Sequence, residues 1–217
     1  MFGLFGHIID FLFPARCAGC GKTGGYLCLH CRSVLPRSQN SPNPEIETFY
    51  KYRKTALSAL IWKLKYRGGR DIAKIIGELF WENLAEKMSE VKLFSGNKQI
   101  LLVPIPIHPG KRRGRGFNQT ELIGKEIAKL DGGIIFKYSP DIIIKIKETL
   151  PQMEIKEKNK RVENAAMSFS AARPESVRGQ TVLVIDDVTT TGATLLDAKR
   201  ALMSAGARKV YLAALSH

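Results

Sequence analysis

The segment from Val182 to Thr194 constrains the fold of this chain more than any other. Four apolar residues, 182–185, predict a buried strand, and two carboxylates, Asp186 and Asp187, follow at its C-terminal end. A loop rich in threonine, with one glycine, then leads into a helical pattern. A strand, a loop and a helix in this order predict a βα unit of an α/β fold, whose ligands bind beyond the carboxyl ends of the strands.

The same segment has the chemistry of a phosphate site. Backbone N–H groups of the loop and the N-terminus of the helix attract an anion, and the hydroxyls of Thr190, Thr191 and Thr194 add donors. Gly192 lets the backbone approach a ligand closely. The two carboxylates would repel that phosphate, so we expect them to face hydroxyl groups or a cation. Neither a P-loop nor a dinucleotide motif is present here, so a sugar phosphate with neighbouring hydroxyls fits best.

The rest of the chain alternates between predicted strands and helices. Apolar runs predict strands at 47–52, 100–103, 142–146, 181–185 and 209–215. Apolar residues at helical spacing predict helices that follow Lys54, Gly69 and Asn118, and one at 194–205. Asn118 is expected to cap its helix together with Glu121, and residues 107–116 are expected to form a loop. This alternation predicts a parallel, doubly wound sheet.

All four cysteines, Cys17, Cys20, Cys28 and Cys31, lie in one window with the spacing C-x2-C-x7-C-x2-C. Two such pairs can place four thiolates around one tetrahedral ion, and so short a segment needs a metal to fold. We predict a structural Zn²⁺ site, with iron as the main alternative metal and His30 as a bystander. The alternatives without a metal are two disulfides or free thiols, of which a cytoplasmic location disfavours the disulfides.

Three prolines in residues 36–45 predict a linker that divides the chain into an N-terminal segment, 1–45, and a main domain, 46–217. Residues 1–13 are apolar, but they are too short to span a bilayer and lack the basic start of a secretory signal. We therefore expect a cytoplasmic protein without a transmembrane segment. The apolar start is expected to pack as a helix on its own domain, with a helix on a membrane surface as the alternative.

The chain carries a formal net charge of +14, which favours anionic partners. One basic cluster, Lys111–Arg115, directly follows the strand predicted at 100–103 and its prolines, which favours a phosphate ligand over a solvated loop or a nucleic-acid contact. A second lies between Lys51 and Lys74, where aromatic residues are interleaved with the basic ones. Such a mixture is typical of sites that bind single-stranded nucleic acid. The alternatives are that Trp62 belongs to the core and that the basic residues form a solvated helix face. The candidate residues of this patch are Trp62, Lys63, Lys65, Tyr66, Arg67 and Arg70.

Segment 182–194 resembles the phosphoribosyl pyrophosphate (PRPP) motif of type I phosphoribosyltransferases at all thirteen positions. Residues 103–119 resemble the pyrophosphate loop of the ComF family, which comprises competence-associated, phosphoribosyltransferase-like proteins of bacteria. The four-cysteine segment and a later Thr-x2-Gln…Arg-x2-Asn pattern, at 149–152 and 161–164, extend this resemblance over the whole chain. It implies a type I phosphoribosyltransferase-like α/β fold, a doubly wound parallel sheet with a small N-terminal zinc-binding segment.

The resemblance also implies a ligand, PRPP with Mg²⁺, and a role for each motif. It assigns the ribose hydroxyls to Asp186 and Asp187 as catalytic residues. The residues implied for the 5′-phosphate are Thr189, Thr190, Thr191, Gly192, Ala193 and Thr194. Those implied for the pyrophosphate are Pro106, His108, Lys111, Arg112, Arg113 and Arg115. A flexible loop would add Gln152, Arg161 and Asn164.

Two functions stay open at this point. The first is a phosphoribosyltransferase enzyme that uses PRPP, in a family linked to DNA uptake. The second is an accessory protein that binds single-stranded DNA beside a competence helicase-like ATPase and keeps its PRPP site for a structural or sensing role.

Overall fold

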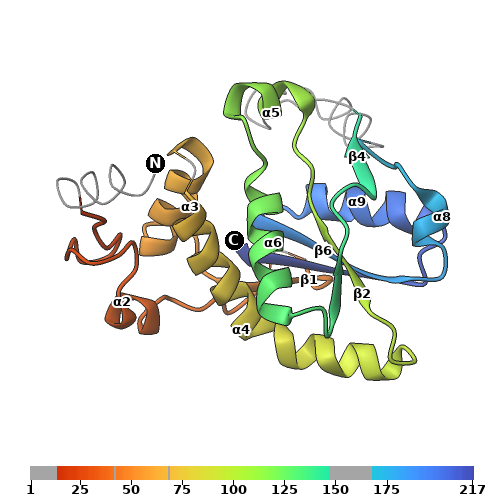
Figure 1. Cartoon of the computed structure of the whole chain (residues 1–217), viewed down its shortest axis with the longest axis horizontal. Helices are drawn as coiled ribbons and strands as arrows, with labels where there is room; N and C mark the ends of the chain where they lie inside the picture. The colour runs from red at the N-terminus through yellow and green to blue at the C-terminus, as the bar shows by residue number, and fades with distance from the viewer. Residues whose placement is uncertain (1–13, 42, 68, 147–167) are drawn as a thin grey trace, which may run out of the picture.

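The computed structural model describes residues 14–41, 43–67, 69–146 and 168–217 (Figure 1). Several predictions lie outside these residues: the apolar start, the Thr149–Gln152 pattern, and the loop candidates Gln152, Arg161 and Asn164.

Five strands form one parallel sheet in the order β1-β7-β6-β2-β3. Every neighbouring pair in this sheet is parallel. The strands are β1 (Ile46–Tyr50), β2 (Ile100–Pro104), β3 (Phe136–Tyr138), β6 (Thr181–Val188) and β7 (Lys209–Ser216). All of β2 and the first five residues of β6 are buried, as expected of strands that are covered on both faces. The predicted α/β fold class, a doubly wound parallel sheet, is confirmed.

Helices cover both faces of the sheet, and β6 packs against both layers. One core contains Leu183 and Ile185 of β6 together with apolar side chains of α3 (Ala56–Arg67), α4 (Arg70–Phe94) and α6 (Gln119–Asp131). The other contains Val182 and Val184 together with side chains of α9 (Ala193–Ser204) and α8 (Pro174–Val177). Side chains of a strand alternate between faces, so Asp187 follows Ile185 toward α3, and Asp186 follows Val184 toward α9.

A second, small sheet packs beside α9. It consists of β4 (Ile143–Lys145) and β5 (Phe169–Ala171), which pair antiparallel. The backbone N–H of Ser168 donates to Asp197 Oδ2 of α9 at 2.8 Å, which ties this sheet to the main domain. The sequence predicted β4, which lies in the apolar run at 142–146, but it did not predict β5, β3 or α8.

The N-terminal segment packs against the main domain. Its helix α2 (Leu29–Ser33) carries Arg32, whose guanidinium forms ion pairs with Glu78 at 2.8 Å and Glu82 at 2.6 Å, both on α4. Part of the predicted linker 36–45 runs beside β1, since Ser38 N donates to Phe49 O at 2.9 Å. The division at residue 45 stays a prediction.

One element was predicted wrongly. Residues 107–116 are not a loop, because α5 (Pro109–Arg115) occupies most of them. The Nδ1 of His108 accepts from Gly110 N at 3.2 Å and caps the helix, Pro109 supplies the fixed φ of a first helical residue, and Gly116 ends it in the left-handed region. Glycine and proline made the segment look irregular, although here they mark helix ends.

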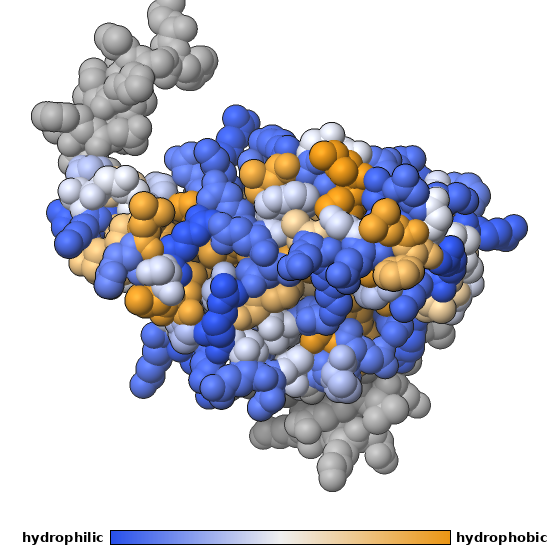
Figure 2. Space-filling model, turned by 90° about the horizontal axis from the view of Figure 1, so that it is seen from below, coloured by the Kyte–Doolittle hydropathy of each residue, from blue (hydrophilic) through white to orange (hydrophobic). Residues whose placement is uncertain are grey.

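None of the described helices combines the length and the hydropathy that crossing a membrane requires. Seen from below, the surface of the molecule is largely hydrophilic, with separate hydrophobic patches (Figure 2).

Candidate phosphoribosyl and metal sites

The segments that follow β6 and β2 begin side by side at one edge of the sheet. Pro104 lies opposite Ile185 in the parallel register, and Ile105 N donates to Ile185 O at 3.0 Å. Parallel strands present their carboxyl ends at the same edge, which is where ligands of such sheets bind. The two segments that the sequence assigned to phosphate and pyrophosphate, 189–194 and 106–115, therefore border one site.

The loop after β6 leads into the N-terminus of α9, whose N-cap residue is a glycine. Gly192 adopts φ 80° and has no side chain to cap the helix, and Ala193 N donates a long hydrogen bond to Thr191 Oγ1 at 3.4 Å. A Cβ at Gly192 would lie 2.4 Å from Ile46 Cδ1, so both the backbone conformation and the space require glycine. Thr190, Thr191 and Thr194 are exposed around this terminus. The arrangement gathers backbone N–H groups and hydroxyls at one helix N-terminus, and their binding of an anion stays a prediction.

The two carboxylates behind the loop have different environments. Asp187 is buried, its Oδ1 accepts from Val188 N at 2.9 Å, and its Oδ2 lies 2.8 Å from the ammonium of Lys65. Asp186 is partly exposed, and its Oδ1 accepts from Asp187 N at 2.8 Å.

Burial and charge in the acid pair shift the pKa values of Asp186 and Lys65. Burial of the carboxylate and the neighbouring charge of Asp187 raise the pKa of Asp186 well above its ordinary value. Burial lowers the pKa of Lys65, but attraction to Asp187 and Asp186 outweighs this effect and leaves the pKa above its ordinary value. Lys65 is therefore a charged ammonium within the acid pair.

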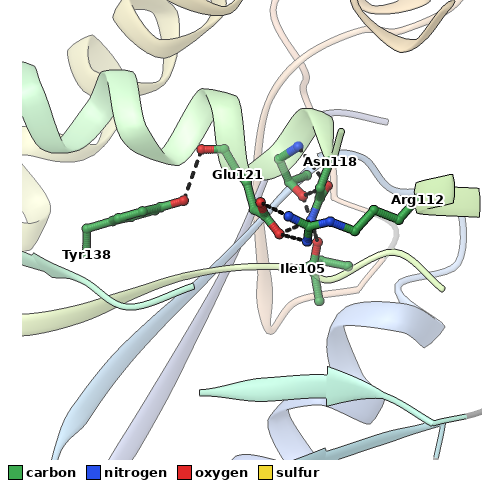
Figure 3. A network of polar contacts seen from close by, with 6 residues as sticks. Ile105, Arg112, Asn118, Glu121 and Tyr138 are labelled. Carbon is green, nitrogen blue, oxygen red and sulfur yellow. Dashed lines mark hydrogen bonds and ion pairs between the residues drawn. The ribbon is translucent and has the colours of Figure 1, made fainter. Parts of the chain in front are cut away.

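The pyrophosphate segment is held by a network at the start of α6 (Figure 3). Asn118 caps α6 by accepting from Thr120 N at 3.1 Å, as predicted, and both residues donate side-chain hydrogen bonds to Ile105 O. Glu121 accepts a long hydrogen bond from Asn118 Nδ2 at 3.4 Å, and it also accepts two shorter ones from Arg112, at 2.6 and 3.1 Å. The charge of Arg112 is thus already balanced.

The other residues predicted to bind the pyrophosphate differ in their exposure and in the contacts that they already make. Lys111 and Arg113 are exposed on α5. Arg115 donates to Gln119 at 2.7 Å, and its guanidinium lies 5.6 Å from the ring centre of Tyr66 on α3. Pro106 and His108 are half-buried, and His108 serves as the helix cap.

The aromatic side chains and one lysine of α3 point in different directions. Trp62 and Tyr66 are 51% and 64% exposed, with ring centres 5.2 Å apart, so the alternative that Trp62 belongs to the core is wrong. Lys63 lies over the ring of Tyr26 at 5.7 Å, and Arg70 is exposed. The ammonium of Lys65 instead points to Asp187. The side chain of Arg67 is not among those that the structure describes. The predicted patch is therefore split between the surface and the acid pair, Asp186 and Asp187.

A pocket of about 590 Å³ adjoins the exposed face of α3. It is lined by Tyr52, Arg53, Lys54, Ser58, Ala59, Trp62 and Lys63. Tyr52 N donates to His217 O at 2.9 Å, which places this pocket beside the end of β7, at the same edge of the sheet as the acid pair.

The four cysteines converge in the N-terminal segment. Their Sγ atoms all lie within 4.8 Å of one another, and Cys28 Sγ is 3.7 Å from those of Cys17 and Cys20. A tetrahedral ion with Zn–S bonds of about 2.3 Å would separate sulfurs by about 3.8 Å, whereas a disulfide would bring two of them to about 2.05 Å. All four cysteines are free, so the cluster has the geometry of a metal site and not of two disulfides.

The surrounding backbone favours thiolate at one of these positions. Hydrogen bonds from the backbone of Cys28 and Cys20 lower the pKa of Cys17 to about 6. Gly19 lies so close to Cys31 that a Cβ there would be 2.7 Å from its Sγ. The cluster is thus built tightly, with no room for a side chain at position 19.

The sequence did not predict the contact of Lys65 with the acid pair. Lys65 was grouped with the surface patch, because its contact with Asp187 joins residues 122 positions apart and leaves no local pattern.

Comparisons with known proteins agree with this architecture. The family model "Phosphoribosyl transferase domain" matches residues 127–216. "Competence protein F" of Haemophilus influenzae is 24% identical over 204 residues, which is 92% of this chain and 83% of that protein. "Competence protein ComFC" of Bacillus subtilis is 26% identical over 88% of this chain and 72% of its own length. "DNA utilization protein YhgH" of Escherichia coli K12 is 24% identical over 90% and 81%.

The unequal environments of the two carboxylates predict opposite effects on stability. Because the pKa of folded Asp186 is raised, its ionised form destabilises the fold, and this cost grows as the pH rises from the ordinary carboxyl range through the folded pKa. Asp186→Asn should therefore raise the free energy of unfolding by about 1 kcal/mol near pH 7.5, with a smaller gain near pH 4.5. Denaturant unfolding at both pH values measures this difference.

Asp187→Asn is the matched control. It removes one carboxylate from the same pair but leaves the half-buried ammonium of Lys65 without its anion, so it should lower stability by about 1–3 kcal/mol. Equal effects of the two substitutions would contradict the assigned environments.

Proposed function

The chain belongs to the ComF family of phosphoribosyltransferase-like proteins, and we propose that it binds PRPP with Mg²⁺ at the carboxyl edge of its parallel sheet. The observation that carries this proposal is the N-terminus of α9, which follows Gly192 and a short threonine loop after Asp186 and Asp187 and lacks a side-chain cap at its N-cap residue. Phosphate donors and hydroxyl acceptors thereby lie next to each other, as a ribose 5-phosphate group requires.

Each part of the ligand has a partner of suitable chemistry. Thr189, Thr190, Thr191, Gly192, Ala193 and Thr194 would hold the 5′-phosphate. The acid pair would accept hydrogen bonds from the ribose hydroxyls, chiefly through the partly exposed Asp186. Exposed Lys111 and Arg113 of α5 would face the pyrophosphate, and Arg112 would have to exchange Glu121 for it.

The residues also fit a divalent cation near the ligand. Carboxylate oxygens are what Mg²⁺ prefers, and the acid pair offers two carboxylates against the single ammonium of Lys65. When bound, Mg²⁺ would neutralise charge on the pyrophosphate. If the bound ligand is transferred, this chain would contribute positioning and electrostatic stabilisation of the leaving group.

Titration calorimetry of the whole chain with PRPP and Mg²⁺ tests the proposal. Asp186→Asn should weaken binding by at least about tenfold, since it removes a charged acceptor of a ribose hydroxyl. Glu175→Gln makes the same change in charge on exposed α8, which precedes β6 at the opposite edge of the sheet, and should leave the affinity unchanged. No binding to the wild type, or full binding to Asp186→Asn, would refute the site.

Pyrophosphate release with candidate nucleobases then separates an enzyme from a protein that only binds PRPP.

We further propose that the cysteine cluster holds one structural Zn²⁺. Four thiolates fill the positions of a tetrahedral ion, which leaves none for a reacting molecule. Elemental analysis should find one ion per chain. Cys17→Ser should lower the metal content and the melting temperature, because the ion replaces the apolar core that so short a segment lacks. A metal-free protein of unchanged stability would exclude the site, and iron in the analysis would replace zinc as its occupant.

A second function, binding of single-stranded DNA, is favoured by the exposed rings of Trp62 and Tyr66 beside the pocket with Arg53, Lys54 and Lys63. Rings on which bases stack, surrounded by cations, are typical of single-strand binding. The relatives named for competence and DNA utilization are consistent with such a role.

The salt dependence of oligonucleotide binding, measured by fluorescence anisotropy, tests this second function. Trp62→Ala should weaken binding by about 1–3 kcal/mol, and Lys63→Ala should reduce the salt slope by about 1. Lys209→Ala, at the opposite end of the sheet, is the control and should change neither. Equal effects of Lys63→Ala and Lys209→Ala would argue against this face of α3.

A further inference from the structure

Asp187 has a charged partner before any ligand arrives. Its side chain is 3% exposed, one oxygen accepts from the backbone of Val188, and the other faces Lys65 at 2.8 Å. Lys65 is itself only 23% exposed, so this is an ion pair largely removed from water and not a surface contact. Truncating one partner of such a pair costs far more than truncating a partner of an exposed pair.

The fold explains why this lysine reaches the acid pair. Leu60, Ile61 and Leu64 of α3 are fully buried against the face of β6 to which Ile185 and Asp187 point. Lys65 directly follows this buried stripe and extends its ammonium to the carboxyl end of the strand. The next residue, Tyr66, contacts Arg115 of α5. One turn of α3 thus touches both segments that border the site.

The charges of the acid pair and of the proposed ligand indicate what the contact between Lys65 and Asp187 does. Two adjacent carboxylates repel a phosphorylated ligand, and the ammonium of Lys65 cancels one of the two charges. It does so without a loosely bound ion, because the side chain is fixed by α3.

We propose that Lys65 is a positioning residue of the phosphoribosyl site that fixes Asp187 and makes the acid pair tolerant of a multiply charged ligand. This inference rests on the proposed function and adds a specificity to it. The more negative charge a ligand carries, the more its affinity depends on Lys65. PRPP carries a pyrophosphate that ribose 5-phosphate lacks, so the two ligands differ in charge but share the groups that the loop after β6 would bind.

Calorimetry with both ligands, in the presence of Mg²⁺, tests the charge dependence. Lys65→Met should weaken PRPP binding by roughly tenfold and ribose 5-phosphate binding by roughly threefold or less. Lys65→Arg keeps the charge and should recover most of the PRPP affinity. Lys209→Met, at the opposite end of the sheet, is the control and should behave like the wild type for both ligands.

A purely structural role for Lys65 would disturb the ribose and phosphate contacts that both ligands share, so equal losses for the two ligands would overturn the proposal, as would no loss at all. If the wild type binds neither ligand, the proposed function itself fails. A ligand-free measurement separates these outcomes: with an amine-reactive reagent and mass spectrometry, Lys65 should react more slowly than Lys63, and Asp187→Asn should accelerate it. Equal rates in the wild type would show that the ion pair does not persist in solution, and would also overturn the proposal.

Discussion

The burial of β6 on both faces is the constraint on which the rest of this structure depends. Its alternating side chains bind α3, α4 and α6 to one side of the sheet and α9 to the other. The same alternation continues into Asp186 and Asp187, so two neighbouring acids leave the strand toward different helical layers. One of them enters a layer where a carboxylate is costly unless it is paired, and the ammonium of Lys65 supplies that pairing.

The N-terminal segment is stabilised in a different way from the main domain. It is too short to fold by apolar burial, so cross-links replace a core: four convergent thiols inside the segment, and the forked ion pairs of Arg32 with α4 outside it. Because α4 packs on the sheet beside α3, the cysteine cluster is supported by the layer that also carries Lys65. The two sites are chemically unrelated, but they share one helical framework.

Sequence reading succeeded where the cause of a structure is local. The apolar run of β6, the capping by Asn118 and the convergence of the four cysteines each arise within a short stretch of chain, and each was predicted. It failed where a distant partner decides the outcome. Lys65 looked like one more surface cation until the fold brought Asp187 to it, and β5 exists only because β4 lies beside it. Helix α5 was missed because its Gly and Pro residues are usually read as breaks.

The contact between Gly192 and Ile46 links the loop after β6 to the first residue of β1. The floor beneath that loop is therefore an isoleucine from the opposite end of the chain, which follows directly on the stretch leading out of the cysteine segment. The volume available at position 192 is set at position 46, so the two positions are coupled in any redesign of this loop. A smaller residue at 46 would open space under Gly192 but not relieve its φ of 80°, and a larger one would displace the loop. The affinity for the anion proposed at this loop would thus depend on a residue of β1, which lies outside the loop.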